Sequence, residues 1–441
     1  MSRPRNLNVV ELFAGVGGFR LGLERANAKV ENGPKWQVNW SNQWEPSNRH
    51  QYASKAYVRN FGPNGHVCHD ISTYLDWEIE NTGSIPSEAQ IHLPRKIDLL
   101  VGGFPCQDYS VAKPLSQSSG LQGKKGVLWW EIYRLLEHNE PNYVLLENVD
   151  RLIQSPGNNR GKDFAVILSC LNFLGYTVQW RVINAADYGF PQRRRRVFIL
   201  AEKRKPKKSS MLNPIDVLSK SGLFASAFPV LTLEPANIRH FVLPADPYIT
   251  SSTFVGNAKT IWGNAGYMMD SEVYTANVSS DFDGQIVTLG SILEKGRVAK
   301  DFYVHADKLS SWRFLKGAKK LDRVNRRTGH QYTYAEGAVK FPDPMNSPSR
   351  TILTSEGGPS PSRSKHVIQT RGGKLRRLTP IELERLQGFP DNWTMFDDKG
   401  QLLSPTTRAF FMGNALVVGI VDIIGQNLLF ASNNKRHTFC L

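Results

Sequence analysis

The chain has 441 residues, of which 40% are hydrophobic and 21% charged, so it is long enough to bury the cores of two or three domains. No apolar run approaches the roughly 20 residues that a membrane-spanning helix needs, and the first thirty residues do not resemble a secretory signal. The four cysteines, Cys68, Cys106, Cys170 and Cys440, are widely separated, which argues against a disulfide framework and against a zinc site. We therefore expect a cytoplasmic protein with reduced thiols and no bound metal.

The net charge of the chain is +16. An excess of this size indicates a polyanionic partner such as a nucleic acid. More than half of the excess falls between Glu202 and Lys374, which is well under half of the chain. A charge that serves only solubility is the alternative interpretation.

Strands and helices are predicted to alternate from the N-terminus to about residue 201. Apolar runs predict strands at 7–13, 36–44, 97–101, 143–146, 177–183 and 197–200, and helical periodicity appears at 128–138 and 164–174. This alternation predicts an α/β fold in which helices cover both faces of a mostly parallel sheet.

The composition changes after Ala201. A basic run at 203–208 leads into a segment rich in Gly, Pro, Ser, Thr and aromatic residues, which predicts short strands and loops. Helical patterns return at 376–386, with Thr379 as N-cap and Pro380 at the first helical position, and at 416–430. We therefore expect residues 1–201 and 376–441 to form one domain, into which residues 202–375 are inserted as a second.

A glycine-rich turn follows the first predicted strand and begins a helix. The turn contains Phe13, Gly15, Gly17 and Gly18. Glycines there allow the backbone to approach a ligand closely. Because Arg20 occupies the third glycine position of a dinucleotide-binding turn, the pattern favours a nucleoside or amino-acid cofactor over a phosphate cradle. A plain tight turn is the alternative.

Two carboxylates downstream are candidates for the same site. Glu45 ends the second predicted strand, where a carboxylate can accept the hydroxyls of a ribose. Asp70 follows soon after and could reach an adenine amino group.

Cys106 lies in the tetrapeptide Phe-Pro-Cys-Gln, directly after a predicted buried strand and the pair Gly102-Gly103. A cysteine held in this way at the end of a strand is placed to be a nucleophile, and neighbouring cations and amides would activate its thiolate. The polar stretch from Gln107 to Gly126 contains several glycines and predicts a mobile lid. An ordinary buried cysteine is the alternative.

Glu147 ends another predicted strand, and four consecutive arginines, 193–196, lead into the strand at 197–200. Strand alternation puts Arg194 and Arg196 on one face and Arg193 and Arg195 on the other, so one pair can face a cleft. A solvated carboxylate, and a solvated basic run or localisation signal, are the alternatives.

The order of these motifs resembles the DNA (cytosine-5) methyltransferase family. The resemblance rests on the turn 13–19, Pro105-Cys106-Gln107, Glu147-Asn148-Val149, Gln192 with Arg194 and Arg196, the helix motif 377–390, Gly413-Asn414-Ala415 and, more loosely, Thr351-Ile352. It covers about 1–201 and 375–430, whereas the segment between matches only in position and character. Tyr109 and Arg195 depart from the family pattern, which often has Phe before the serine and an acidic residue between the two key arginines.

The resemblance implies a Rossmann-like domain dependent on S-adenosyl-L-methionine, with an inserted target-recognition domain. Cys106 would add to carbon 6 of cytosine, and Glu147 would hold ring nitrogen 3 and the exocyclic amine. Arg194 would orient the base carbonyl, and Arg196 would support Glu147 or the substrate. The cofactor pocket would be lined by Phe13, Gly15, Gly17, Gly18, Glu45, Asp70, Ile71, Pro105, Leu128 and Asn414. Contacts to DNA would come from Gln107, Ser110, Gln192, Arg193 and Thr351.

These implications predict a bacterial or archaeal type II restriction–modification enzyme. It would act as a monomer, flip a cytosine out of double-stranded DNA and methylate carbon 5, which would protect the site from a cognate restriction endonuclease. A tRNA cytosine-5 methyltransferase is one alternative, against which the long insertion argues. A non-catalytic DNA-binding regulator is another, against which the intact Cys106, Glu147 and Arg194 argue. A nicotinamide-dependent Rossmann enzyme would leave Cys106 and the arginine run unexplained.

Overall fold

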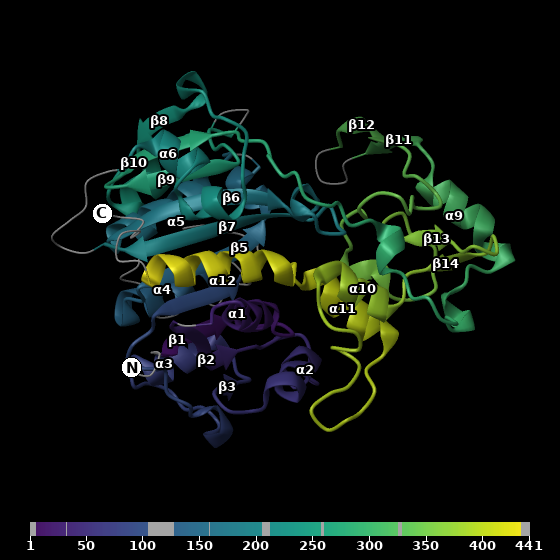
Figure 1. The fold of residues 1–441 in the computed structure, drawn as a ribbon, viewed down its shortest axis with the longest axis horizontal. Coiled ribbons are helices and arrows are strands. Elements are labelled where there is room, and N and C mark those ends of the chain that lie inside the picture. The colour runs from purple at the N-terminus through teal and green to yellow at the C-terminus, as the bar shows by residue number, and fades with distance from the viewer. Residues whose placement is uncertain are drawn as a thin grey trace.

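The computed structural model describes residues 6–31, 33–104, 128–157, 159–204, 212–256, 260–324 and 329–433, with the backbone alone for 332 and 431–433. Four predicted site residues, Pro105, Cys106, Gln107 and Ser110, lie outside the described residues. Figure 1 shows a large body built on one sheet and a smaller lobe beside it.

The centre of the body is a ten-stranded sheet with the order β3-β2-β1-β4-β5-β7-β6-β9-β10-β8. Its strands are β1 (Asn6–Leu12), β2 (Lys35–Asn42), β3 (His66–Val67), β4 (Leu99–Gly103), β5 (Tyr143–Val149), β6 (Tyr176–Asn184), β7 (Arg195–Lys203), β8 (Arg239–Val242), β9 (Ala265–Met269) and β10 (Glu272–Ala276). The pairs from β3 to β5 are parallel, and the pairs from β5 to β8 are antiparallel. The α/β fold is confirmed, but the sheet is mixed because β7 runs opposite to β5 and β6, which flank it.

Helices cover both faces of this sheet. The α-helices are α1 (Gly18–Ala28), α2 (Tyr52–Phe61), α3 (Ile71–Glu78), α4 (Leu128–Asn139), α5 (Lys162–Phe173), α6 (Pro214–Ser219), α7 (Leu223–Ala227), α8 (Pro247–Thr253), α9 (Leu309–Lys316), α10 (Pro380–Gln387), α11 (Pro405–Asn414) and α12 (Val418–Asn433). Because side chains alternate along a strand, Val10 faces a core with α3, α4 and α5, while Val9 faces a core with α1, α7 and α12. The yellow α12 crosses the body in Figure 1 and packs along α1, so the first and the last described helices lie in the same body.

Part of the segment expected to be inserted belongs to the large sheet. The three strands β8, β9 and β10 extend the sheet beyond β6, which sequence patterns did not predict. The absence of a side chain at Gly266 lets β9 pair with β6, because an added Cβ would lie 1.9 Å from the ring of Trp180 on β6. The smaller lobe is formed by later residues, with α9, the hairpin of β11 (Lys319–Val324) and β12 (Gln331–Glu336), and the pair β13 (Val367–Gln369) and β14 (Leu375–Arg377) (Figure 1).

The N-terminus of α10 confirms a local prediction. Thr379 is the N-cap, its side chain accepts the N–H of Glu382, and Glu382 in turn accepts the N–H of Thr379. Pro380 occupies the first helical position. Arg376 pairs with the same Glu382 carboxylate at 2.6 Å, so the helix start is fixed to β14.

Among the described residues, no single helix has both the length and the apolar composition that crossing a membrane requires. A bent pair, α11 with residues 418–430 of α12, meets these two criteria together, with 41° between its halves.

Candidate active site

The predicted site residues gather at the carboxyl ends of the parallel strands. Phe13 follows β1, Glu45 follows β2, Asp70 follows β3 and Glu147 lies near the end of β5. Strands β1 and β4 are neighbours, and the chain proceeds from them to opposite sides of the sheet, to β2 and to β5. This is the topological switch point at which open α/β sheets bind ligands.

The glycine turn has the conformation that its sequence requires. Phe13, Gly15 and Gly17 have φ values of 54°, 57° and 88°, all in the left-handed region. The N–H of Gly15 donates to Oε1 of Gln43 at 2.7 Å, which fastens the turn to the end of β2. A side chain at Gly17 would overlap the ring of Phe61, whereas a side chain at Gly15 would enter open space. Gly17 is therefore fixed by packing, and Gly15 borders the space that a ligand can fill.

Glu11 lies buried beneath this turn and was not among the predicted site residues. Its Oε1 accepts the N–H of Arg20 at 3.3 Å, and its Oε2 accepts the hydroxyl of Tyr57 at 2.9 Å. Since the N-cap Gly17 has no side chain, Glu11 supplies the carboxylate at the start of α1. Burial raises the pKa of Glu11 to about 7, against the lowering effects of Tyr57 and Arg20. A charged residue within the apolar strand 7–13 is the sequence signal that could have identified it.

Glu45 and Asp70 each keep one carboxylate oxygen for a ligand. Oε2 of Glu45 accepts the side-chain amide of Asn48 at 3.2 Å, while Oε1 has no hydrogen bond to a described residue. Asp70 is the N-cap of α3, and its Oδ1 accepts the N–H groups of Ser72 and Thr73 at 3.0 and 3.2 Å. Its Oδ2 makes no hydrogen bond within the described part of the chain. Both side chains therefore suit the binding of hydroxyl or amino groups.

The other predicted cofactor residues begin or end helices. Ile71 is the buried first residue of α3, Leu128 begins α4, and Asn414 is the exposed last residue of α11. A side chain added at Gly18 would lie 3.2 Å from Leu416, so the segment that carries Asn414 reaches the glycine turn. Within the described ranges, no group of three or more His, Cys, Asp or Glu residues could hold a metal ion.

Glu147 is paired with Arg196 across two strands of the sheet. Nε of Arg196 lies 2.8 Å from Oε1 of Glu147, and the Glu147 side chain is 11% exposed. Burial raises the pKa of Glu147, while Arg196 and then Arg194 offset part of this effect. A carboxyl group whose pKa is raised can hold a proton and donate it in a hydrogen bond.

Asn148 ties this strand to the segment that precedes Cys106. Its side-chain amide donates to the carbonyl of Phe104 at 2.8 Å, and the Phe104 ring packs on Trp129. Gly103 is opposite Glu147 in the parallel register, and a side chain there would lie 3.3 Å from Oε2 of Glu147. The chain is therefore fixed beside Glu147 at Phe104, two residues before Cys106, which itself lies outside the described residues.

The four arginines alternate as predicted, and Arg196 pairs with Glu147 as one of its two expected roles required, but the partners of Arg194 and Arg195 were not foreseen. Arg193 and Arg195 are exposed, and Arg195 pairs with Asp150 at 3.0 Å. Arg194 is buried and donates to the carbonyls of Ile352 at 3.1 Å and Gly413 at 2.8 Å.

Burial, followed by the charge of Arg196, lowers the pKa of Arg194 to about 9, partly countered by Glu147. Both terminal nitrogens of Arg194 are occupied by main-chain carbonyls. This arrangement does not favour the expected contact between Arg194 and the base carbonyl.

Gln192 was expected to contact DNA, but its side chain is fully buried. Its Oε1 accepts the N–H of Ile352 at 2.9 Å, and its Nε2 donates to Oε1 of Gln387 at 3.2 Å. Gln387 in turn donates to the carbonyl of Met412 at 2.6 Å. Thr351, another expected DNA contact, donates its hydroxyl to the carbonyl of Arg193 at 2.5 Å. These residues hold four separate sequence motifs together.

A family model for C-5 cytosine-specific DNA methylase matches residues 7–429. The chain belongs to this family. The methyltransferase is 43% identical over 426 residues to the type II methyltransferase M.Sau3AI of Staphylococcus aureus. The alignment covers 96% of this chain and 95% of that protein. It is 25% identical to the type II methyltransferase M.SsoII of Shigella sonnei over 97% of this chain and 82% of that protein. The predicted family and enzyme class are therefore confirmed.

The solved structures show the same fold. The S. pombe Dnmt2 methyltransferase aligns with a TM-score of 0.57 at 16% identity, over 97% of this chain and 99% of its own. The Entamoeba histolytica methyltransferase EhMeth aligns with a TM-score of 0.53 at 15% identity, over 98% and 100%. The predicted methyltransferase fold is therefore confirmed.

Proposed function

We propose that this DNA cytosine-5 methyltransferase takes its methyl group from S-adenosyl-L-methionine and transfers it to a cytosine flipped out of duplex DNA. We further propose that it protects DNA as the modification enzyme of a type II restriction–modification system, in which a cognate endonuclease cuts the same unmodified sequence. The observation that carries the proposal is the Arg196–Glu147 pair beside Phe104, at the switch point of the sheet. The extensive identity to M.Sau3AI supports the assignment to a type II system.

The residues around the glycine turn fit S-adenosyl-L-methionine. Gly15 borders open space, and Glu45 and Asp70 keep one oxygen each, which suits ribose hydroxyls and the adenine amine. Phe13 lies beside Gly102 at the end of β4, where its ring can pack against a nucleoside. The cofactor, when bound, supplies the methyl group as an electrophile.

The protein must make carbon 5 of cytosine nucleophilic, because that atom reacts poorly by itself. We assign this to Cys106, whose thiolate forms a bond to carbon 6 while ring nitrogen 3 receives a proton from the Glu147 carboxyl group. The ring electrons displaced by the sulfur then make carbon 5 reactive. After carbon 5 has gained its methyl group, a base removes the proton from that carbon, and the carbon–sulfur bond breaks to release the thiolate. Ring nitrogen 3 returns its proton to the Glu147 carboxylate, which restores the enzyme and leaves neutral 5-methylcytosine. The raised pKa of Glu147 supports its role as proton donor.

The two arginines take different parts in this proposal. Arg196 holds Glu147 through Nε and donates from Nη1 to the carbonyl of Arg195, while Nη2 has no hydrogen bond to a described residue. We therefore assign the base carbonyl to Arg196 in place of Arg194. Arg194 acts indirectly, because it connects Ile352 and Gly413 behind the site.

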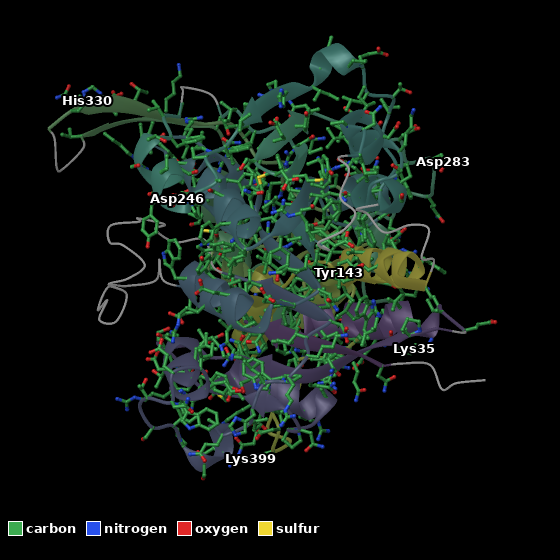
Figure 2. All side chains as sticks on the ribbon, turned by 90° about the vertical axis from the view of Figure 1, so that its left-hand side faces the viewer. Lys35, Tyr143, Asp246, Asp283, His330 and Lys399 are labelled. Carbon is green, nitrogen blue, oxygen red and sulfur yellow. The ribbon has the colours of Figure 1, made fainter. Side chains whose placement is uncertain are left out.

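The smaller lobe supplies a candidate element for DNA recognition. The β11–β12 hairpin stands away from the body in Figure 1, and the start of β12 near His330 extends outward in Figure 2. Five of the six residues of β11 are exposed, including Lys320 and Arg323. A two-stranded ribbon fits the major groove of B-DNA, and basic side chains on it can contact phosphates.

Methyl transfer measured with labelled cofactor on duplex DNA and on tRNA tests this function. Cys106→Ser should abolish transfer while DNA binding remains, and Glu147→Ala should lower the rate by a factor on the order of 100 or more. Glu140→Gln is a matched control, because Glu140 is an exposed carboxylate paired with Lys203. Full turnover by Glu147→Ala would contradict the mechanism, and preferential methylation of tRNA would support the alternative substrate.

A further inference from the structure

A buried serine, histidine and glutamate form a row in the smaller lobe, away from the residues assigned to chemistry. Nδ1 of His366 lies 2.8 Å from Oε1 of Glu356, and its Nε2 lies 3.1 Å from Oγ of Ser349. The main-chain N–H of His366 donates to the second Glu356 oxygen at 2.9 Å. His366 is 0% exposed, and its two partners are also buried.

This order of groups resembles a hydrolase triad, but the serine is not placed to attack a substrate. The Ser349 hydroxyl donates its one hydrogen to the carbonyl of Arg350 at 2.8 Å. Its remaining bond to His366 therefore uses an oxygen lone pair, so Nε2 of the imidazole is the donor. Nδ1 faces a carboxylate oxygen, so the imidazole bridges Glu356 and Ser349 with a hydrogen-bond partner at each ring nitrogen.

Ser349 is joined directly to the arginine segment of the active site. Its N–H donates to the carbonyl of Pro191 at 2.7 Å, and its carbonyl accepts the N–H of Arg193 at 2.8 Å. These bonds form a short parallel bridge in which Ser349 lies opposite Gln192. Three residues after Arg193, Arg196 meets Glu147. A continuous series of hydrogen bonds thus connects Glu356 in the smaller lobe to the chain that carries Arg196.

We propose that His366 is a positioning residue for methyl transfer, which acts through Ser349 to hold the 191–194 segment and so places Arg196 against Glu147. The inference rests on the proposed active site. Glu356 keeps the imidazole oriented, the imidazole fixes Ser349, and Ser349 fixes the segment through its main chain. The segment in turn determines where the guanidinium of Arg196 enters the site.

Two variants separate this role from general stability. Ser349→Ala removes one hydroxyl and leaves the main-chain bridge intact, whereas His366→Ala removes the whole imidazole. Each is measured by the single-turnover rate of methyl transfer with saturating duplex DNA and S-adenosyl-L-methionine. DNA affinity and thermal unfolding are measured on the same preparations, and rates are expressed per folded molecule. His240→Gln is the control, because His240 and Glu272 pair through exposed side chains at the end of the sheet formed by β10 and β8.

We expect Ser349→Ala to slow the chemical step about fivefold, which corresponds to the loss of one hydrogen bond, and His366→Ala to slow it about tenfold or more. DNA affinity should stay within about threefold of the wild-type value. The double variant should be no slower than His366→Ala, since both changes interrupt the same series of contacts. Added imidazole should restore part of the His366→Ala rate.

Unchanged single-turnover rates in both Ser349→Ala and His366→Ala, with Glu147→Ala inactive in the same assay, would overturn the inference and leave the proposed active site standing. The inference would also be overturned if the total rate fell but the rate per folded molecule did not, since a purely structural contact lowers only the folded fraction. Full activity of Glu147→Ala would instead show that the proposed active site is wrong.

Discussion

Replacing Glu11 with glutamine should remove a pH dependence of stability that the native protein has. Burial raises the pKa of this carboxyl group from 4.5 to about 7 in the folded state. Tyr57 and Arg20 contact it, and the charge of Glu24 lies nearby. Because the folded pKa is the higher one, Glu11 stabilises the fold fully below pH 4.5, and this contribution is lost as the pH rises through about 7.

The magnitude follows from the two pKa values. Integrating proton binding between pH 5 and pH 8 for a group that titrates at 4.5 unfolded and about 7 folded gives about 2.5 kcal/mol. Glutamine cannot titrate but can still accept the N–H of Arg20. The stability of Glu11→Gln relative to wild type should therefore improve by about 2.5 kcal/mol over this range.

Urea unfolding of both proteins at pH 5, 6, 7 and 8 measures this difference. Glu24→Gln is a matched control, because Glu24 lies on α1, the helix whose first turn Glu11 contacts, but its side chain is 47% exposed. Parallel stability profiles for wild type and Glu11→Gln would refute the reasoning, because they would show that folding does not perturb this carboxyl group.

Further predictions concern the active-site backbone, the buried arginine and the hairpin. Gly103→Ala should lower kcat about tenfold by crowding Glu147, while cofactor affinity stays near the wild-type value. The control Gly372→Ala should leave kcat unchanged, because the added methyl group meets no neighbouring atom. Equal kcat values for the two variants would contradict this prediction. Arg194→Met leaves two main-chain carbonyls unpaired and should destabilise the fold by about 3 kcal/mol in thermal unfolding, compared with little change in exposed Arg195→Met. Lys320→Gln should weaken DNA binding and reduce the slope of log affinity against log salt by about 1. Lys399→Gln should leave the slope unchanged, because Lys399 lies at the opposite end of Figure 2 from His330.

Strands and helices of the body could be predicted from sequence because their apolar patterns are local. The run 197–200 indicates a buried strand, but it does not reveal that β7 runs antiparallel to β5. The pairing of β9 with β6 was also missed, since it depends on how Gly266 accommodates the Trp180 ring, a fit between residues distant in the chain. Direction and partner are tertiary properties that hydrophobic periodicity does not carry.

The candidate site shows the same division. Strand alternation correctly separated Arg194 and Arg196 from Arg193 and Arg195. It could not show that Arg194 donates its hydrogen bonds to main-chain carbonyls while Arg196 pairs with Glu147. Gln192 was assigned to DNA from the family motif that it shares with Arg194 and Arg196, yet its partners come from segments that only the fold brings together.

The central claim is that Cys106 becomes covalently bonded to the cytosine that is methylated. Duplex DNA with 5-fluorocytosine at the target position tests it most directly, because fluorine cannot leave carbon 5 as a proton does. The account predicts a complex of protein and DNA that survives denaturation, requires S-adenosyl-L-methionine, maps to Cys106 by peptide mass spectrometry and is absent from Cys106→Ser. A fully active preparation that forms no such complex, or one linked through another residue, would contradict it.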